Sequence, residues 1–173
     1  MLSHLGIVLF LWFNWGMAKA SSGSGKTRNK KGIKKPLNGR GAGAIFYIRS
    51  TDRFMFFLRD DKDTIPCPGM IDIIGGHLED GETPEEGAMR EFAEELDDLD
   101  TGEPFKPTGL VLFKSWVDDR NVEQNIFGCE LDNMPILHLK EGQRLVFLKR
   151  DELPTVNFAF GYNDVVREYA ATV

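Results

Sequence analysis

Short apolar runs rich in β-branched and aromatic residues begin at Gly41 and predict strands. They are GAGAIFYIRS at 41–50, FMFFLRD at 54–60 and MIDII at 70–74, the last followed by Gly75 and Gly76. Runs of this length and composition between turn residues are typical of β-strands. The sequence therefore predicts three strands in this part of the chain.

The pattern then changes to a period of four residues and predicts a helix running to about Leu96. Thr83 is suited to the N-cap, Pro84 to the first helical position and Glu86 to a capping box. The apolar positions that form one stripe along this helix are Ala88, Phe92 and Leu96. We expect this stripe to be buried and the acidic residues to lie on other faces.

The second half repeats the order of three strands followed by a helix. Further strand-like runs are GLVLFKSWV at 109–117, NIFGCEL at 125–131 and RLVFLK at 144–149, and a helix-like tail spans about 162–171. Both hairpin-length and crossover-length connections occur, so the predicted fold class is α/β with a mixed sheet.

Composition limits the class of protein. The chain has 173 residues, of which 42% are apolar and 11% aromatic, and this excludes intrinsic disorder. Cys67 and Cys129 lie far apart without a C-x-x-C pair, which excludes a disulfide framework or a cysteine zinc site. We expect both to be buried small side chains.

The charge is distributed unevenly. Residues 1–40 carry 8 of the 21 Lys and Arg residues and no acid, which leaves 13 basic residues against 27 acidic ones in the remainder. Surfaces that bind a nucleic-acid duplex neutralise phosphates with clustered Lys and Arg. The acidic body therefore argues against such a surface.

Residues 1–38 are predicted to be an apolar and then basic segment outside a domain at 39–173. The apolar run Leu5 to Phe13 is too short for a transmembrane helix. Three alternatives stay open: a signal peptide, a weak membrane-surface anchor, or a start placed upstream of an initiator at Met17. Basic residues after the run favour a cytoplasmic location over membrane association or export.

Residues 20–27 nearly match the phosphate loop G-x-x-x-x-G-K-[ST], with Ala20 in place of the first glycine. That motif needs a strand before it and a helix after it. The following RNKKGIKKPLNGRG combines clustered like charge with glycines and a proline. We therefore interpret this segment as a solvated basic linker.

Three carboxylates share one face of the predicted helix. At about 100° per residue, Glu94 and Glu95 lie on either side of Glu91. Together they could form a hard-oxygen cation site. They could also form a plain solvated acidic face, because like charges at these spacings cost only roughly a few tenths of a kcal/mol.

The spacing of the residues around these glutamates favours the cation site over the solvated acidic face. Gly76, five residues, Glu82, seven residues and then Arg90-Glu91-Phe92-Ala93-Glu94-Glu95 resembles the signature of the Nudix hydrolases (MutT-like), G-x5-E-x7-R-E-U-x-E-E-x-G-U with U apolar. The resemblance covers residues 41–173 and implies an α/β/α sandwich whose catalytic loop and helix span about 75–97. Asp97 and Asp98 replace the final Gly and apolar residue, so we expect this helix to end differently.

The resemblance also implies roles. Residues matching Glu91, Glu94 and Glu95 ligate Mg²⁺ or Mn²⁺ in the family, assisted by a loop carbonyl near Gly75 or Gly76, and Arg90 and Glu82 brace the loop against the helix. It implies metal-dependent hydrolysis of a diphosphate bond in a nucleoside diphosphate linked to another moiety, by default a nucleoside triphosphate. The alternatives are a non-enzymatic nucleotide sensor on the same fold and a membrane-associated interaction protein resting on residues 1–40 alone.

The signature does not fix the general base. In the family an acidic residue from a later loop often completes the site, and we expect Glu141, beside Gly142, to do so. The competing residues are Glu123, Glu130 and Asp118. Other side chains are expected to be structural rather than functional, namely His77 and His138, and the possible base-stacking residues Trp116, Phe127 and Tyr162.

Overall fold

The computed structural model describes residues 37–173. A seven-stranded mixed sheet forms its centre, with the order β10-β2-β1-β8-β7, β3 beside β2 and β4 beside β1. Its strands are β1 (Gly39–Ile48), β2 (Arg53–Leu58), β3 (Ile71–Asp72), β4 (Ile74–His77), β7 (Val111–Val117), β8 (Val122–Leu131) and β10 (Arg144–Lys149). Each of the strand-like runs predicted between residues 41 and 149 is therefore a strand, although the third run divides into β3 and β4 at Ile73.

Strand β1 organises the sheet because it is buried on both faces. It runs parallel to β8 from Gly39–Val122 to Ile48–Leu131 and antiparallel to β2 and β4. Its side chains alternate between two apolar clusters, with Phe46 in one and Ile45 in the other. Near-continuous apolar sequence is what a strand covered on both faces requires.

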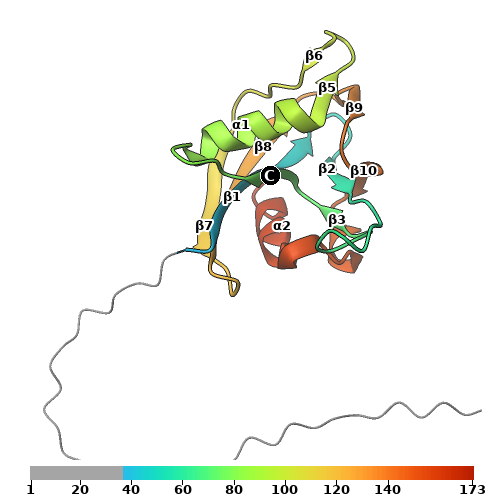
Figure 1. Cartoon of the computed structure of the whole chain (residues 1–173). Coiled ribbons are helices and arrows are strands. Elements are labelled where there is room, and N and C mark those ends of the chain that lie inside the picture. Colours follow the sequence, from blue (N-terminus) through green and yellow to red (C-terminus); the bar gives the residue numbers. More distant parts are fainter. Residues whose placement is uncertain (1–36) are drawn as a thin grey trace, which may run out of the picture. The chain divides into compact units, whose positions relative to one another are not determined.

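One helix covers each face of this sheet (Figure 1). Helix α1 (Pro84–Glu95) contributes Phe92, whose ring meets Phe46 edge-on at 5.3 Å between centroids. Helix α2 (Asn163–Ala170) covers the other face and is preceded by two short 3₁₀ helices, η1 (Leu153–Thr155) and η2 (Ala159–Gly161). The α/β/α sandwich is confirmed, and so is the buried stripe of α1, which ends in the fully buried Leu96.

A second, smaller sheet has the order β6-β5-β9 and was not predicted. Its strands are β5 (Leu96–Asp98), β6 (Glu103–Pro104) and β9 (Leu137–Leu139). Strands of two or three residues are too short to show a period of two. Their place in the fold depends on contacts with distant parts of the chain.

The exit of α1 explains how the chain accommodates Asp97 and Asp98. Leu96 is extended, with φ −132° and ψ 134°, and the chain passes directly into β5 without a left-handed turn. Asp97 accepts a hydrogen bond from Lys140 Nζ at 2.9 Å. The helix therefore ends in a way that needs no glycine.

One smaller expectation needs correction. Cys129 is buried as predicted, but Cys67 is only half-buried and lies in a loop with φ 53°. Residues 1–36 of the apolar and basic segment predicted at 1–38 lie outside the described residues. Within 37–173, no helix has the length and apolar character needed to cross a membrane.

The predicted domain boundary near residue 38 leads to a stability prediction. Asn38 donates from its backbone N–H to Asn121 O at 2.8 Å and from its side chain to Arg120 O at 2.6 Å. A protein starting at Leu37 should unfold at the temperature of the full chain, whereas one starting at Gly39 should lose about 1–2 kcal/mol with these two bonds. Thermal unfolding of the three proteins tests this, and a large loss on removing residues 1–36 would contradict the boundary.

Candidate active site

The loop between β4 and α1 is fixed to the start of the helix as the sequence predicted. Glu86 N–H donates to Thr83 Oγ1 at 3.3 Å, and Thr83 N–H donates to the Glu86 carboxylate at 2.9 Å. This capping box satisfies two backbone donors that the first helical turn leaves unpaired. It sets the direction in which α1 leaves the loop.

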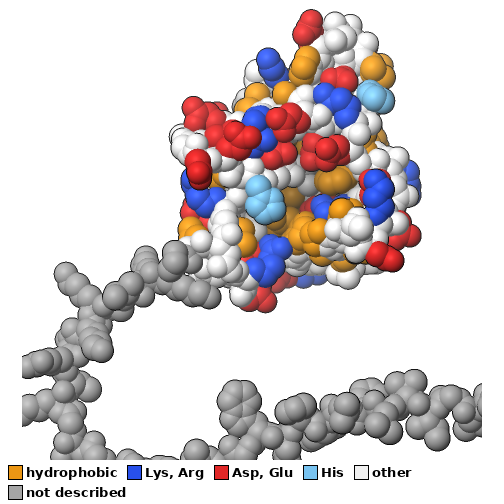
Figure 2. Space-filling view, in the orientation of Figure 1, with side chains coloured by type: hydrophobic (Ala, Val, Ile, Leu, Met, Phe, Trp, Pro, Cys, Tyr) orange, Lys and Arg blue, Asp and Glu red, His pale blue; other side chains and the backbone are white. Residues whose placement is uncertain are grey.

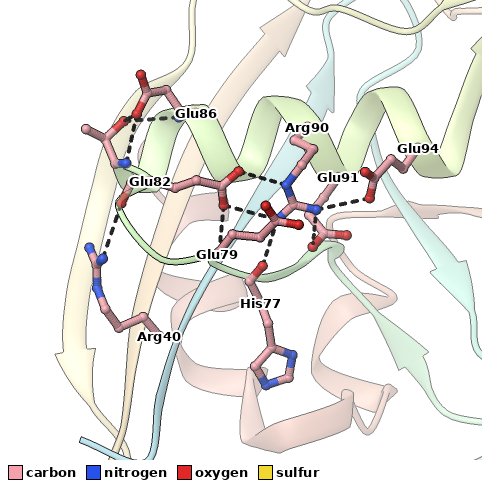
Figure 3. Close-up of polar contacts among 9 residues, drawn as sticks. Arg40, His77, Glu79, Glu82, Glu86, Arg90, Glu91 and Glu94 are labelled. Atoms are coloured by element: carbon pink, nitrogen blue, oxygen red, sulfur yellow. Dashed lines mark hydrogen bonds and ion pairs between the residues drawn. The ribbon is translucent and has the colours of Figure 1, made fainter.

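Arg90 joins this loop to the helix (Figure 3). Its Nε and Nη2 donate to the Glu82 carboxylate at 2.8 and 3.1 Å, and Nη2 also donates to the His77 carbonyl at 2.8 Å. Its Nη1 donates to Glu91 and Glu94, both at 3.0 Å. The hydrogen bond from Arg90 is the main cause that lowers the pKa of Glu82.

Glu95 is the buried member of the carboxylate face. The residue is 8% exposed, and its Oε2 has no hydrogen-bond partner among the described residues. Burial raises the pKa of Glu95 to about 8, and the charges of Glu91, Glu141 and Asp72 add to this effect. A buried carboxylate oxygen without a partner costs free energy unless a cation or donor meets it.

Glu91 and Glu94 lie on the same helix face as Glu95, and their side chains differ in burial. Burial raises the pKa of Glu91, although the hydrogen bond from Arg90 opposes this rise. The Glu94 side chain is 59% exposed. In the space-filling view the acidic side chains gather over α1 around a basic one (Figure 2).

Two glycines of β4 allow the strand backbone to lie against these carboxylates. A Cβ on Gly76 would stand 2.5 Å from Glu91 Cδ. Gly75 has φ 144°, and a Cβ there would stand 2.3 Å from Ala42 O. A side chain at Gly75 would clash with the main chain, and one at Gly76 would displace the Glu91 carboxylate, so main-chain atoms line the floor of the site.

Glu141 is brought to the same face by its neighbour. Lys140 N–H donates to Glu95 O at 2.8 Å, and Lys140 Nζ donates to Ala93 O at 2.8 Å. The charge of Glu141 contributes to the raised pKa values of Glu91 and Glu95. Gly142, with φ 90°, packs on Phe57 and the Leu58 carbonyl rather than facing open space.

The three competing acids are engaged elsewhere. Glu123 pairs with Arg40 at 3.5 Å and Glu130 with Arg49 at 2.9 Å. Asp118 accepts hydrogen bonds from Arg120 and from the Val122 backbone. None of these three contributes to the raised pKa values of Glu91 and Glu95.

The carboxylates of this helix face are the kind of ligand that a divalent cation prefers, but their side chains are not arranged around one metal position. Among residues 37–173, no three His, Cys, Asp or Glu side chains converge on one metal position. Arg90 Nη1 instead forms ion pairs with the carboxylates of Glu91 and Glu94. The unpaired Glu95 oxygen and the side-chain-free floor are what a hard cation with oxygen ligands would use.

A cavity of about 290 Å³ adjoins this floor. Gly75, Gly76 and His77 form part of its wall, and the His77 ring points away from α1 (Figure 3). The His77 imidazole makes no hydrogen bond or ion pair with another side chain of the described part. The other polar or aromatic residues lining the cavity are Arg59, Asp72, Arg120, Gln124, Phe160 and Tyr162.

Most of this lining was not predicted from the sequence. Asp72 is 4% exposed and pairs with Arg59 at 2.9 Å, and burial raises the pKa of Asp72 to about 6. A lone acid inside the apolar run MIDII was a signal that could have found it. Tyr162 lines the cavity while Phe127 belongs to the core, and Trp116 meets the Tyr162 ring edge-on at 6.2 Å.

Known proteins share this arrangement at the level of a family. The family model described as NUDIX domain matches residues 37–167. A search of curated protein sequences finds no match.

Solved structures share the fold at low identity. A MutT structure from work on Aliivibrio salmonicida and Vibrio cholerae superposes with TM-score 0.58 at 19% identity, covering 78% of this chain and 97% of the other. The NUDIX domain of Shewanella oneidensis NrtR, complexed with ADP ribose, gives 0.63 at 11%, covering 83% and 94%. A C. elegans Ap4A hydrolase in a binary complex gives 0.59 at 16%, covering 76% and 96%.

The raised pKa of Glu95 predicts how stability depends on pH. The unfolded chain releases this proton near the ordinary value of 4.5, whereas the folded protein keeps it to about pH 8. The native state thus binds more protons in this window, so stability falls as pH rises from about 4.5 to about 8. In a chelator, Glu95→Gln should gain stability relative to the parent protein from pH 5 to pH 8.

The exposed Glu85→Gln variant is the control and should keep the parent's slope, since it leaves Glu95 in place. Thermal unfolding at several pH values measures both differences. Parallel curves for Glu95→Gln and the parent would contradict the assigned burial effect.

Proposed function

Because the chain belongs to the NUDIX family, whose enzymes hydrolyse nucleoside diphosphate derivatives and generally use divalent metal ions, we propose that it cleaves a diphosphate bond in a nucleoside diphosphate linked to another moiety. A nucleoside triphosphate is the default substrate. The observation that carries the proposal is the unpaired buried oxygen of Glu95 beside Glu91. A hydrogen bond from the Gly75 backbone reaches this carboxylate and leaves Oε2 as its unpaired oxygen among the described residues.

Glu91, Glu94, Glu95 and the Gly76 carbonyl are the groups we propose to hold Mg²⁺ or Mn²⁺. Such an ion lowers the pKa of water and neutralises negative charge on phosphate oxygens, which suits hydrolysis of a diphosphate bond. Glu95 contributes a ligand that is already desolvated by the fold. Glu94, on the exposed side, can move toward an ion with little rearrangement.

Arg90 and Glu82 are proposed as the brace of the site. Three of the hydrogen bonds of Arg90, the two to Glu82 and the one to the His77 carbonyl, do not involve Glu91 or Glu94. The guanidinium therefore holds the loop on the helix independently of the carboxylates that would bind a cation. This separates a positioning role from a ligand role within one cluster.

Glu141 is proposed as the general base that takes the proton of the attacking water. Its backbone neighbour Lys140 is bonded to the end of α1, so Glu141 stays close to Glu91 and Glu95. Its side chain is not engaged with a described basic residue at ion-pair distance. An exposed carboxylate without such a partner is free to accept a proton.

The compounds named for two of the similar structures support a nucleotide as substrate. One is a domain complexed with ADP ribose and another an Ap4A hydrolase. ADP ribose and Ap4A each contain a nucleoside attached to linked phosphates, although they differ in what lies beyond. We further propose a cytoplasmic location, which rests on the basic residues that follow the N-terminal apolar run.

Removal of the ligand carboxylates is expected to abolish most of the activity. Glu94→Gln and Glu95→Gln should each lower the hydrolysis rate at least about 10²-fold with Mg²⁺ present, because both lose the charge that holds the cation. The assay uses nucleoside triphosphates, dinucleoside polyphosphates, ADP-ribose and nucleotide sugars. Glu85→Gln, on the same helix, should retain the parent's rate.

Unchanged turnover in Glu95→Gln would contradict the metal assignment. Binding of these compounds without hydrolysis of any, in the parent protein with Mg²⁺ or Mn²⁺, would support the nucleotide sensor instead. Circular dichroism of each variant confirms that the fold is kept.

The base proposal predicts a different kinetic pattern. Glu141→Gln should lower kcat by roughly 10²–10⁴-fold and leave KM little changed, since a general base acts on the chemical step. Glu123→Gln serves as the comparison because Glu123 is bonded to Arg40. A loss below about fivefold for Glu141→Gln, or a larger loss for Glu123→Gln, would move the role away from Glu141.

A further inference from the structure

Lys140 binds the C-terminal end of α1 through a main-chain and a side-chain donor. Its backbone N–H donates to Glu95 O at 2.8 Å, and its Nζ donates to Ala93 O at 2.8 Å. The last carbonyls of a helix have no partner within the helix and carry a partial negative charge, which a cation stabilises. The last turn of α1 contains no basic residue, so Lys140 supplies this cation from a distant part of the chain.

Asp97 fixes the position of this ammonium group. Its Oδ1 accepts a hydrogen bond from Lys140 Nζ at 2.9 Å, and both side chains are partly buried. Charge pairs that are partly buried are screened by salt and solvent less than fully exposed pairs. Asp97 is also the residue at which the chain departs from the glycine of the Nudix signature. It therefore supplies a carboxylate that this glycine lacks.

The pairing of β5 with β9 brings Asp97 close to Lys140. Asp97 is opposite His138 in this ladder, and Leu96 is opposite Leu139. Lys140 directly follows β9, and its side chain reaches back to α1. His138 Nδ1 also lies 3.8 Å from the Asp97 carboxylate. The small sheet thus places one carboxylate beside the residue that follows β9.

The other side of Glu141 is attached to the end of β2. Gln143 N–H donates to Leu58 O at 2.8 Å, and its side-chain Nε2 donates to Arg59 O at 2.7 Å. Only residues 141 and 142 lie between Lys140 and Gln143, so the chain between these two attachments spans at most roughly 10 Å. The position of Glu141 therefore depends on both attachments.

We propose that Asp97 and Lys140 are positioning residues for Glu141. Their ion pair fixes Lys140 on the end of α1, and this directs the Glu141 carboxylate toward the proposed metal ligands. Neither side chain is assigned a contact with substrate or cation, so both act through Glu141. This inference rests on the proposed function, because it concerns the base of that same site.

Steady-state kinetics with Mg²⁺ tests this role on nucleoside triphosphates, dinucleoside polyphosphates, ADP-ribose and nucleotide sugars. Lys140→Met should lower kcat roughly tenfold and leave KM little changed, because displacing a reacting group by about 1 Å can cost roughly 10²-fold in rate. Asp97→Ala should lower kcat about threefold, since the bonds from Lys140 to α1 remain. Lys140→Arg should keep kcat within about twofold of the parent's, because it retains a cation with N–H donors.

A double variant separates positioning of the base from a general structural role. In a protein that already carries Glu141→Gln, Lys140→Met should change kcat by less than about twofold, because the group that it positions no longer acts as a base. A loss transmitted through the backbone of Glu95 would persist in this background. Lys114→Met is the matched control, since Lys114 is a similarly exposed lysine that pairs with Glu168 on α2, and it should keep the parent's kcat.

Hydrogen exchange measures the attachment of Lys140 without any hydrolysis. In Asp97→Ala, the Lys140 amide, which is bonded to Glu95 O, should exchange at least about threefold faster than in the parent protein. The Gln143 amide is bonded to the end of β2 instead, and its exchange should change less. Lys114→Met should leave both rates as they are in the parent.

Three results would overturn the inference: an unchanged kcat in Lys140→Met, a loss in this variant that persists beside Glu141→Gln, or unchanged exchange of the Lys140 amide in Asp97→Ala. A parent protein that cleaves while Lys140→Met keeps its rate rejects the positioning role alone. A parent protein that cleaves none of the compounds rejects the proposed function, and faster exchange in Asp97→Ala would still support the attachment of residue 141 by this ion pair.

Discussion

The position of one guanidinium sets the geometry of the candidate site. Arg90 lies on α1, only 23% exposed, and bonds to Glu82 on the preceding loop and to the His77 carbonyl at the end of β4. Without this cation, the carboxylates of Glu82, Glu91 and Glu94 would repel one another at short range, and the loop would lose its main polar attachment to the helix. The wall of the cavity, the floor of the carboxylate site and the start of α1 all follow from the loop that Arg90 holds.

The large elements of the fold were predictable from the sequence because each carries its own local signal. The capping box at Thr83, the four-residue stripe ending in Leu96 and the long run at 41–50 all match observed elements. The small sheet of β5, β6 and β9 escaped because its pairing joins residues such as Asp97 and His138 that are far apart in sequence. Tertiary contacts determine such short strands, and no local pattern indicates them.

The candidate site also has one part that the sequence predicts and one part that it does not. The spacing from Gly76 to Glu95 predicts which loop and helix residues come together, because they are neighbours on one helix and the loop that precedes it. The cavity draws on Arg59, Arg120 and Phe160, which come from three separate connections of the chain. A single sequence contains no signal that joins them, and only the mixed sheet brings their positions together.

The anchoring of Lys140 has a consequence for how this protein could change over evolution. Lys140 holds its neighbour Glu141 near the end of α1 through hydrogen bonds to the carbonyls of Glu95 and Ala93. The connection at 133–135 is fixed independently at both ends, since Asp132 O accepts from Ser50 N–H and Ile136 O accepts from Leu99 N–H. Because doubling the length of a loop costs only about 0.6 kcal/mol, insertions there could lengthen this connection while Glu141 stays where it is.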